Sequence, residues 1–439
     1  MDLLVIPVPF FDKNMAVQAY YFRYQEGNEL MNANQATNEF DGAMLSPLLA
    51  TLNAVGIDAF TMDKPIFVPI NNLMLLADLA QQCRVPYEKV IFVLESDVQP
   101  EEPYLSHIRA LKEKGFRFAV QKLDRVDAYA PVVELCDYIY FDHRLMDQPQ
   151  QQLMYALTRR NFPKLSIVMT HIHTNEYFEA LREQGPLYFE GRFYRIPITK
   201  GEHQVKPLKM NLIKLLNLVR DENFEFSSVA EVVQQDTALT VSLMRMINSP
   251  FLGLRQKVKS VSHAVTILGQ VETRKWVITA VSKLLGADRP DELTRLSLVR
   301  AKFAENLAPA FRLKDQSQSL FLMGLFSVLD SILELSMEEA LQMVQVSDTI
   351  RDALLHGQGE FGTLLSFIYQ YEAADWKTIS RMLIMYDLTP EDIYKAYLNA
   401  LQWYKNLLEG GDVEDEEAGP AAPPAGQGGN RTGGRSRRR

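Results

Sequence analysis

Cysteine is nearly absent from this chain, which has two cysteines, Cys83 and Cys136, among its 439 residues. Two cysteines cannot build the disulfide framework of a small secreted domain, and both lie among apolar neighbours, so we expect reduced core thiols. Long apolar runs are also missing: the longest candidate, Leu320 to Leu329, ends at Asp330 and is shorter than the roughly 20 residues that span a bilayer. The N-terminus lacks the basic stretch of a signal peptide. These absences predict a cytoplasmic protein.

Positive charge is in deficit, because 46 lysine and arginine residues stand against 55 aspartate and glutamate residues, a formal net charge of −9. A general nucleic-acid binder needs a basic surface, so that function class is not expected, although a local basic site remains open. Apolar residues, at 47%, are present in sufficient number for sizeable cores. The length favours two domains of roughly 200 residues each.

Residues 1–199 alternate short β-rich runs with helical patterns. The expected strands are Leu3–Pro7, Ala16–Tyr24, Ile66–Ile70, Val90–Leu94, Arg117–Val120, Tyr138–Phe141, Leu165–Met169 and Leu187–Phe189. Helices are expected between several strands, for example Pro103–Lys114 and Pro149–Arg160, each opening on a proline that suits the first helical position. This alternation predicts an α/β fold with a parallel sheet, closed as a (β/α) barrel of the TIM type. Because about 200 residues is short for eight units, some helices should be abbreviated.

Residues 200–408 show apolar residues at helical spacing and few strand patterns, which predicts an all-α domain. The expected helices are Leu212–Asp221, Ser228–Gln235, Thr237–Asn248, Ser260–Leu268, Arg274–Leu285, Asp291–Ala310 and Ile379–Met385. Ser227 or Ser228 is expected to cap the helix that carries Glu231, and Ser260 is expected to cap a later one. Residues 409–439 are acidic, then rich in Pro, Ala and Gly, then basic, and are expected to form a disordered tail.

The polar residues at the predicted strand ends follow a recognisable order. Arg23 closes the run Ala19-Tyr20-Tyr21-Phe22-Arg23, Glu95 follows Phe92-Val93-Leu94, and Asp142 follows Tyr140-Phe141. With Glu190-Gly191 near the end of the half, this order resembles the EAL family of cyclic-di-GMP phosphodiesterases across nearly all of residues 1–199. The resemblance implies an EAL-like barrel. In active members, strand-end carboxylates hold divalent cations that activate water.

Several positions depart from the family pattern. The resemblance places the family's metal-ligating, water-positioning and later acidic residues on Ala19, Pro69 (or Asn71 if the register slips), Gln121, Lys122, Tyr140 and Thr170. The positions that keep the family's residue are Arg23, Glu95 and Asp142, whereas Glu190 replaces the glutamine of a Gln-Gly pair. Two carboxylates are too few for a two-metal site. The resemblance therefore implies that this barrel holds no metal and catalyses nothing.

The barrel mouth leaves one binding alternative open. Arg23 and Lys122 could contact the phosphates of a nucleotide as fixed cations. Otherwise Arg23 pairs with Glu95 or Asp142 inside the mouth, which is the arrangement we expect.

Histidines near the end of one strand raise a metal alternative. His171 and His173 alternate along the strand and share a face, so they could hold a metal together with a third ligand such as His143. We expect instead a histidine pair without a metal.

Residues 234–269 carry a second resemblance. Asp236 precedes a helical run, Asn248-Ser249-Pro250 ends it, and Gly269 follows Ile267-Leu268. This series resembles the HDOD domain, a helical relative of the metal-dependent HD hydrolases, and the likeness continues more weakly to about residue 400. From the residues themselves, Asp236 suits an N-cap, Pro250 a helix stop and Gly269 a helix C-cap.

The metal centre of HD hydrolases has no counterpart in this half. Ser327 and Val328 occupy the His-Asp positions, and no histidine occurs between His263 and His356. A metal phosphohydrolase site cannot be assembled from these residues. HDOD domains resemble HD enzymes in fold only, so this departure is what the resemblance implies.

Large apolar side chains leave a partner surface open as well. Met244, Met246 and Phe321–Phe326 could form one, although helix-packing core is the more common role. The tryptophans Trp276, Trp376 and Trp403 are expected to be core or interface anchors, and the sequence does not separate the two.

These observations predict a degenerate EAL-like barrel over residues 1–199, an HDOD domain over 200–408 and a tail over 409–439. The hypothesis is a non-catalytic bacterial signalling regulator without cofactors, acting on protein partners in cyclic-di-GMP circuits that control motility, surface attachment or virulence. One alternative is a sensor that binds cyclic di-GMP without cleaving it, and another is a residual phosphodiesterase. A homo-oligomer is compatible with all three.

Overall fold

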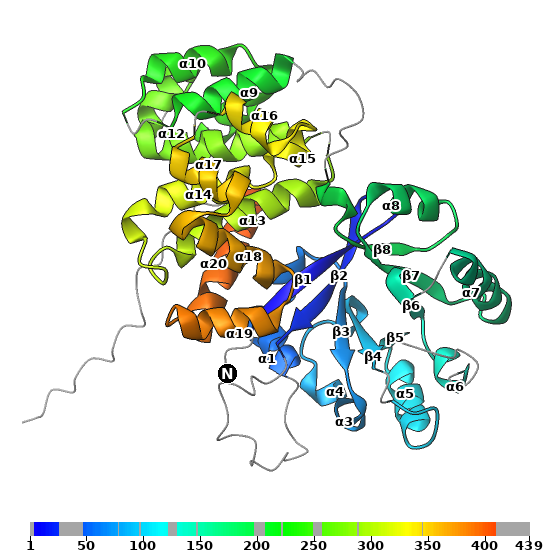
Figure 1. The fold of residues 1–439 in the computed structure, drawn as a ribbon. Coiled ribbons are helices and arrows are strands. Elements are labelled where there is room, and N and C mark those ends of the chain that lie inside the picture. The colour runs from blue at the N-terminus through cyan, green and yellow to red at the C-terminus, as the bar shows by residue number, and fades with distance from the viewer. Residues whose placement is uncertain are drawn as a thin grey trace, which may run out of the picture.

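The fold is described on a computed structural model. The description covers residues 4–25, 47–77, 79–95, 98–121, 130–145, 148–196, 207–220, 223–248, 257–287, 289–344 and 346–409. Lys122, Ser249, Pro250 and the predicted tail beyond residue 409 lie outside these residues. Within them, the predicted combination of an α/β barrel followed by a helical region is confirmed (Figure 1).

Eight strands close into a barrel in chain order. They are β1 (Val5–Phe11), β2 (Val17–Tyr24), β3 (Ile66–Ile70), β4 (Val90–Leu94), β5 (Arg117–Val120), β6 (Tyr138–Asp142), β7 (Ser166–Ile172) and β8 (Tyr188–Gly191). All five residues of β3 and of β4 are buried, as expected for parallel strands that are covered on both faces. One cluster of side chains, which includes Phe10, Ala19 and Phe67, fills the interior of the barrel.

The first strand departs from the predicted parallel sheet. β1 pairs antiparallel with β2 and also with β8, while β2 to β8 pair parallel. The cause is the short connection between β1 and β2, where Asp12 Oδ1 accepts hydrogen bonds from the backbone N–H groups of Asn14 and Ala16. A connection of so few residues can join only antiparallel strands, because a parallel pair needs a long crossover.

The helices around the barrel are short, as the chain length predicts. They are α1 (Pro47–Val55), α2 (Asp58–Thr61), α3 (Asn72–Leu76), α4 (Leu79–Gln82), α5 (Tyr104–Glu113), α6 (Ala130–Val133), α7 (Gln148–Asn161) and α8 (Asn175–Arg182). Single 3₁₀ turns are η1 (Tyr87–Lys89), η3 (His143–Leu145) and η4 (Phe193–Arg195).

The helical region runs from residue 207 to 409. It comprises α9 (Pro207–Leu218), α10 (Phe226–Gln234), α11 (Thr237–Ile247), α12 (Val261–Leu285), α13 (Asp291–Leu307), η6 (Lys314–Gln316), α14 (Ser317–Phe326), α15 (Leu329–Leu333), α16 (Met337–Met343), α17 (Asp348–His356), α18 (Gly359–Glu372), α19 (Trp376–Met385) and α20 (Pro390–Glu409). None of the described helices is both long enough and apolar enough to cross a membrane.

One predicted helix cap in this region is wrong. α10 begins at Phe226 after Glu225, which makes no side-chain cap bond, so neither Ser227 nor Ser228 caps it. Gly269 has the non-helical angles φ 74° and ψ 178°, so α12 consists of two helical segments that meet at a kink at this glycine, as the predicted break requires. A glycine can take this backbone conformation without a Cβ clash, and therefore the two predicted helices join directly. The caps at Asp236 and Ser260 are present, each accepting a backbone N–H bond.

The helical region packs directly on the barrel. Helices α18, α19 and α20, drawn in orange in Figure 1, lie beside β1 and β2. The buried Tyr371 hydroxyl donates to the carbonyl of Val5 in β1 at 2.8 Å. Tyr20 of β2 donates to the carboxylate of Glu292 in α13 at 3.0 Å. These contacts join residues more than 250 positions apart, so the two halves share one buried boundary.

One ion cluster holds this boundary together. The guanidinium of Arg300 donates to both carboxylate oxygens of Glu372, at 2.8 and 2.7 Å, and Arg195 from η4 donates to the same carboxylate at 2.9 Å. We call Arg195, Arg300 and Glu372 the junction cluster. Burial alone would raise the pKa of Glu372, but the charges of the two arginines outweigh it and hold that pKa below its usual value.

Candidate barrel-mouth pocket

A cavity of about 780 Å³ lies at the carboxyl ends of the barrel strands. Carboxyl ends of strands β2 to β8 meet at this face, which is where barrel folds place their ligand sites. The polar side chains that line the cavity are Arg23, Glu95, Gln121, Asp142, Arg144, Thr170, His171 and Glu190. We call this cavity the barrel pocket. Residues predicted for one site from positions spread over nearly 170 residues are thus brought together.

Ala19 does not line the barrel pocket. It is fully buried in β2 and packs in the barrel interior with Phe10 and Phe67. Pro69 lines the pocket, whereas Asn71 accepts a hydrogen bond from the backbone N–H of Met74 and caps α3. At the position of the family's first glutamate, Ala19 therefore packs in the barrel interior and does not face the pocket. Asn71 has a local structural role as a helix cap.

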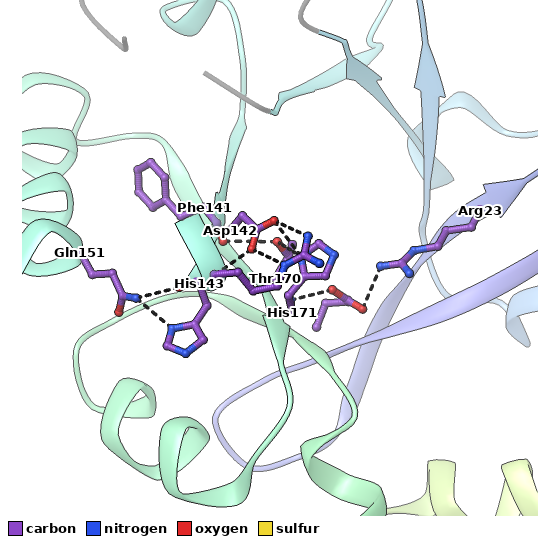
Figure 2. Close-up of polar contacts among 9 residues, drawn as sticks. Arg23, Phe141, Asp142, His143, Gln151, Thr170 and His171 are labelled. Carbon is purple, nitrogen blue, oxygen red and sulfur yellow. Dashed lines mark hydrogen bonds and ion pairs between the residues drawn. The ribbon is translucent and has the colours of Figure 1, made fainter. Parts of the chain in front are cut away.

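Arg23 is held by a carboxylate that sequence reasoning did not select as its partner. Its guanidinium donates to Glu190 at 3.2 Å, and the other oxygen of Glu190 accepts the backbone N–H of His171 at 2.9 Å (Figure 2). The expectation that Arg23 pairs inside the mouth is right in kind, but its predicted partners, Glu95 and Asp142, are wrong. Arg23 and Glu190 lie in β2 and β8, the two strands that flank β1. Their chain separation hides this proximity.

Asp142 at the end of β6 lies between the guanidinium of Arg144 and the imidazole of His171. Its carboxylate accepts hydrogen bonds from the guanidinium of Arg144, at 2.8 and 3.1 Å, and lies 3.2 Å from Nδ1 of His171. Burial works to raise the pKa of Asp142, but the bonds from Arg144 and the nearby His171 outweigh it and lower the pKa. Asp142 is therefore an ionised acceptor at neutral pH.

The three histidines near this mouth do not gather around one point. Burial lowers the pKa of both His171 and His173, which favours neutral imidazoles. His143 instead contacts the ring of Tyr177. Its Nδ1 lies 2.8 Å from the side-chain amide of Gln151 (Figure 2). The alternative of a metal held by all three histidines is not supported by this arrangement.

Two tyrosines give the floor of the pocket buried hydroxyl groups. Burial raises the pKa of Tyr21 to about 12, and its hydroxyl is hydrogen-bonded to Gln121. The hydroxyl of Tyr140 is buried and has no hydrogen-bond partner among the described residues. A buried polar group without a partner is costly, so a ligand or water that offers an acceptor here gains a hydrogen bond.

The described donors do not fit the metal centre of the resembled family. Among the residues that the structure covers, no three His, Cys, Asp or Glu side chains converge as a metal site requires. Asp142 is engaged by Arg144 and Glu190 is engaged by Arg23. Lys122, at the second position of the family's aspartate pair, lies outside the described residues, and Gln121 lines the pocket as an amide.

The signature residues of the helical region have structural partners. Asp236 accepts the backbone N–H of Leu239 at 3.0 Å. Asn248 bridges the ends of the segment 249–257: its amide donates to the carbonyl of Val258 at 3.0 Å and its oxygen accepts the Val258 N–H at 2.8 Å. These bonds tie Asn248, at the end of α11, to Val258.

Ser327 has a structural partner as well. Its buried hydroxyl accepts a bond from Arg300 of the junction cluster at 2.6 Å. The position on which the resemblance places a metal-binding histidine of HD hydrolases is therefore hydrogen-bonded to the junction cluster.

Sequence reasoning did not select several residues that line the pocket, among them Arg144, Ala374 and Trp376. Arg144 lies two residues after Asp142, a local spacing that could have suggested a charge pair. Ala374 and Trp376 come from the α18–α19 corner of the helical region and also line the cavity. No local signal connects them to a site in the barrel, because only the packing of the two halves brings them there.

Comparison with known proteins gives a family match for part of the helical region and relatives that span both halves. Residues 206–354 match the HDOD domain. The chain is 25% identical over 417 residues to the uncharacterized protein YuxH of Bacillus subtilis, covering 93% of this chain and 100% of that one. It is 25% identical over 328 residues to the cyclic di-GMP phosphodiesterase CdgJ of Vibrio cholerae, covering 74% of this chain and 75% of that one. The solved EAL enzyme Bd1971, in its cAMP and cyclic-di-GMP bound form, matches with TM-score 0.34 and 8% identity over 43% of this chain and 60% of that chain.

The resemblance to an EAL-like barrel joined to an HDOD domain is thereby confirmed. The expectation that the chain is not an enzyme is overturned by the Vibrio cholerae relative, which is named as a phosphodiesterase. The physical reason lies in the pocket. Three carboxylates, Glu95, Asp142 and Glu190, line one cavity, so groups able to accept or donate a proton remain there. The position-by-position comparison with the family pattern treated Glu190 only as a replaced glutamine and did not count it among the pocket's carboxylates.

Proposed function

We propose that this chain acts in cyclic-di-GMP signalling in the cytoplasm, binding the dinucleotide in the barrel pocket and passing its occupancy to a protein partner through the helical region. The observation that carries the proposal is Arg23, a strand-end guanidinium in a cavity large enough for a small-molecule ligand. Arginine suits the phosphodiester group because its planar fork can donate two parallel hydrogen bonds.

The surroundings of Arg23 support phosphate binding. Glu190 orients the guanidinium through one N–H group, and the guanidinium has five N–H donors in total. Arg144 adds a second positive charge on the opposite side of the strand ring, at the end of β6. Gln121, Thr170 and the Tyr140 hydroxyl add neutral donors to the cavity wall. Each guanidinium is also paired with a carboxylate, Arg23 with Glu190 and Arg144 with Asp142, and keeps further N–H groups that can donate to a phosphodiester oxygen.

Hydrolysis of the bound dinucleotide is the second candidate function. It is favoured by the phosphodiesterase relative and by the carboxylates Glu95, Asp142 and Glu190 in one pocket. A carboxylate within reach of a bound water can accept its proton as the water attacks phosphorus. The neutral imidazole favoured at His171 could do the same.

Calorimetry on the full chain tests the binding proposal. Cyclic di-GMP should bind the wild type, and Arg23→Ala should weaken binding roughly 10- to 100-fold, because a hydrogen bond to a charged group contributes about 1.5–3 kcal/mol. Arg109→Ala is the matched control, since Arg109 pairs with Glu102 on the exposed face of α5. Absence of heat at high micromolar cyclic di-GMP would contradict the proposal.

A turnover assay separates the two candidate functions. The protein is incubated with cyclic di-GMP and Mg²⁺ or Mn²⁺, and the product is followed by chromatography. Product formation that Glu95→Gln abolishes supports hydrolysis, whereas intact substrate with preserved binding supports the sensor. A pull-down with the full chain, with and without cyclic di-GMP, then tests whether a protein partner responds to the ligand.

A further inference from the structure

The α18–α19 corner of the helical region closes one side of the barrel pocket. Ala374 and Trp376 line the same cavity as Arg23 and Tyr24 of β2. A pocket that belonged to the barrel alone would be lined only by residues before position 200. Its wall therefore comes from both halves of the chain.

The corner is held against the barrel on both sides of Trp376. Before it, the Tyr371 hydroxyl donates to Val5 and Glu372 binds Arg195. After it, the hydroxyl of Ser380 in α19 accepts a hydrogen bond from the Gln25 side chain at 2.9 Å. These contacts leave little freedom for the corner to swing away from the pocket.

The orientation of Trp376 is also fixed. Asp375 caps α19 by accepting the backbone N–H of Thr378 at 3.1 Å, which places Trp376 as the first residue of the helix. The Tyr371 ring packs against the indole at 5.5 Å with an interplanar angle of 87°. Ala374 follows the C-cap of α18 and has φ 55°, and the Asp375 N–H donates to the Gln370 carbonyl at 3.0 Å, so this left-handed residue ends α18 and turns the chain into α19. The α18–α19 corner therefore presents a partly buried aromatic ring of fixed orientation to the cavity.

We infer that Trp376 is a binding residue that stacks on a purine base of the ligand whose phosphodiester lies against Arg23. The inference rests on the proposed function and deepens it, because it makes the helical region part of the nucleotide site. An indole is a suitable platform for any purine, since every base has a π-face. Ligand occupancy then acts directly on the corner that carries Glu372 of the junction cluster.

Binding measurements on the full chain test this role. Trp376→Ala should weaken the binding of cyclic di-GMP about 5- to 100-fold, the loss that stacking of one base predicts. Trp376→Phe keeps a ring and should lose less. Trp403→Ala is the matched control, because Trp403 packs on Phe321 in the helical region and does not line the pocket.

Intrinsic tryptophan fluorescence gives a readout that a purely structural role of Trp376 would not change. Cyclic di-GMP should quench tryptophan emission in the wild type and in Trp403→Phe, and Trp376→Phe should lose that quenching while it still binds in calorimetry. Wild-type affinity in Trp376→Ala, or quenching that survives in Trp376→Phe, would overturn the inference and leave the proposed function standing. A wild type that binds no cyclic di-GMP would overturn both.

Discussion

Two arginine–glutamate sites in this molecule use the same chemistry in different surroundings. At the barrel mouth, Arg23 meets Glu190 through one contact of 3.2 Å, and the Arg23 side chain is 29% exposed. At the boundary between the halves, Arg300 meets Glu372 through two contacts, Arg195 adds a third, and the Arg300 side chain is 3% exposed. The first site opens into a cavity, and the second is enclosed by both halves.

The burial of each ion pair and the number of hydrogen bonds that its carboxylate accepts determine what each site can do. A buried carboxylate with three charge-assisted bonds is expensive to disturb, because removing it leaves two arginines in a medium that solvates them poorly. A partly exposed ion pair contributes little to stability, and its two side chains can rearrange around a third charged group. The junction cluster is therefore suited to holding the two halves together, and Arg23 is suited to meeting a ligand.

Replacing the shared carboxylate should have the largest effect. Glu372→Gln is expected to lower the free energy of unfolding by about 3–5 kcal/mol, since Arg195 and Arg300 lose their common counter-charge. Urea unfolding of the full chain measures this. Glu391→Gln is the control: Glu391 forms an exposed pair with Lys395, and its loss should cost less than about 0.5 kcal/mol. Equal losses of unfolding free energy in Glu372→Gln and Glu391→Gln would contradict the expected difference between the buried and the exposed ion pair.

Lowering the pH should progressively remove the stabilisation that the ionised Glu372 carboxylate contributes. The pKa of Glu372 is lower in the folded protein than in the unfolded chain, so its stabilisation is complete above the unfolded value of about 4.3 and is lost as pH falls through the lower folded value. The stability gap between wild type and Glu372→Gln should therefore be constant from pH 7 to about pH 5 and shrink below that. A stability difference between wild type and Glu372→Gln that increases as pH falls would contradict a lowered pKa of Glu372 in the folded protein.

The hydroxyl that joins α18 to β1 should have an intermediate effect. Tyr371→Phe removes the buried bond to the Val5 carbonyl and should cost about 1–2 kcal/mol in urea unfolding. Tyr155→Phe is the matched control, because the buried Tyr155 hydroxyl has no hydrogen-bond partner among the described residues. Its removal should be neutral or slightly stabilising. A loss in the control as large as in Tyr371→Phe would mean that ring packing, not the bond, dominates.

The smallest effect on stability is expected at the barrel mouth. Arg23→Ala should change the free energy of unfolding by less than about 1 kcal/mol, since Arg23 is partly exposed and Glu190 keeps its bond from the His171 N–H. The same variant should lose most of its affinity for cyclic di-GMP. A strongly destabilised Arg23→Ala would place this residue with the junction cluster instead of with the ligand site.

The strands that could be predicted most accurately are those with a continuous apolar run. β3, β4 and β5 have the predicted bounds, because burial on both faces requires apolar residues at every position. β1 was predicted as Leu3–Pro7 and extends over Val5–Phe11, although Pro7 and Pro9 argue against a long strand. Pairing with β2 and β8 overrides that local signal.

The candidate site was predictable in part. Strand-end positions such as Arg23, Glu95, Asp142 and Glu190 could be chosen because barrel folds collect their ligand residues there. Their partners could not be chosen, since the Arg23–Glu190 pair depends on how β2 and β8 flank β1. The absence of activity that was predicted from the substituted positions is contradicted by the phosphodiesterase relative, and three carboxylates that the motif retained or introduced line one cavity.

The sequence by itself determined the two kinds of architecture and most local boundaries, because apolar periodicity and caps such as Asp236 and Ser260 act over a few residues. Only the tertiary structure decided which charges meet and which residues enclose the pocket. Arg195, Arg300 and Glu372 are far apart in the chain, and Trp376 lies more than 350 residues from Arg23. Such contacts depend on long-range packing, which no local pattern encodes.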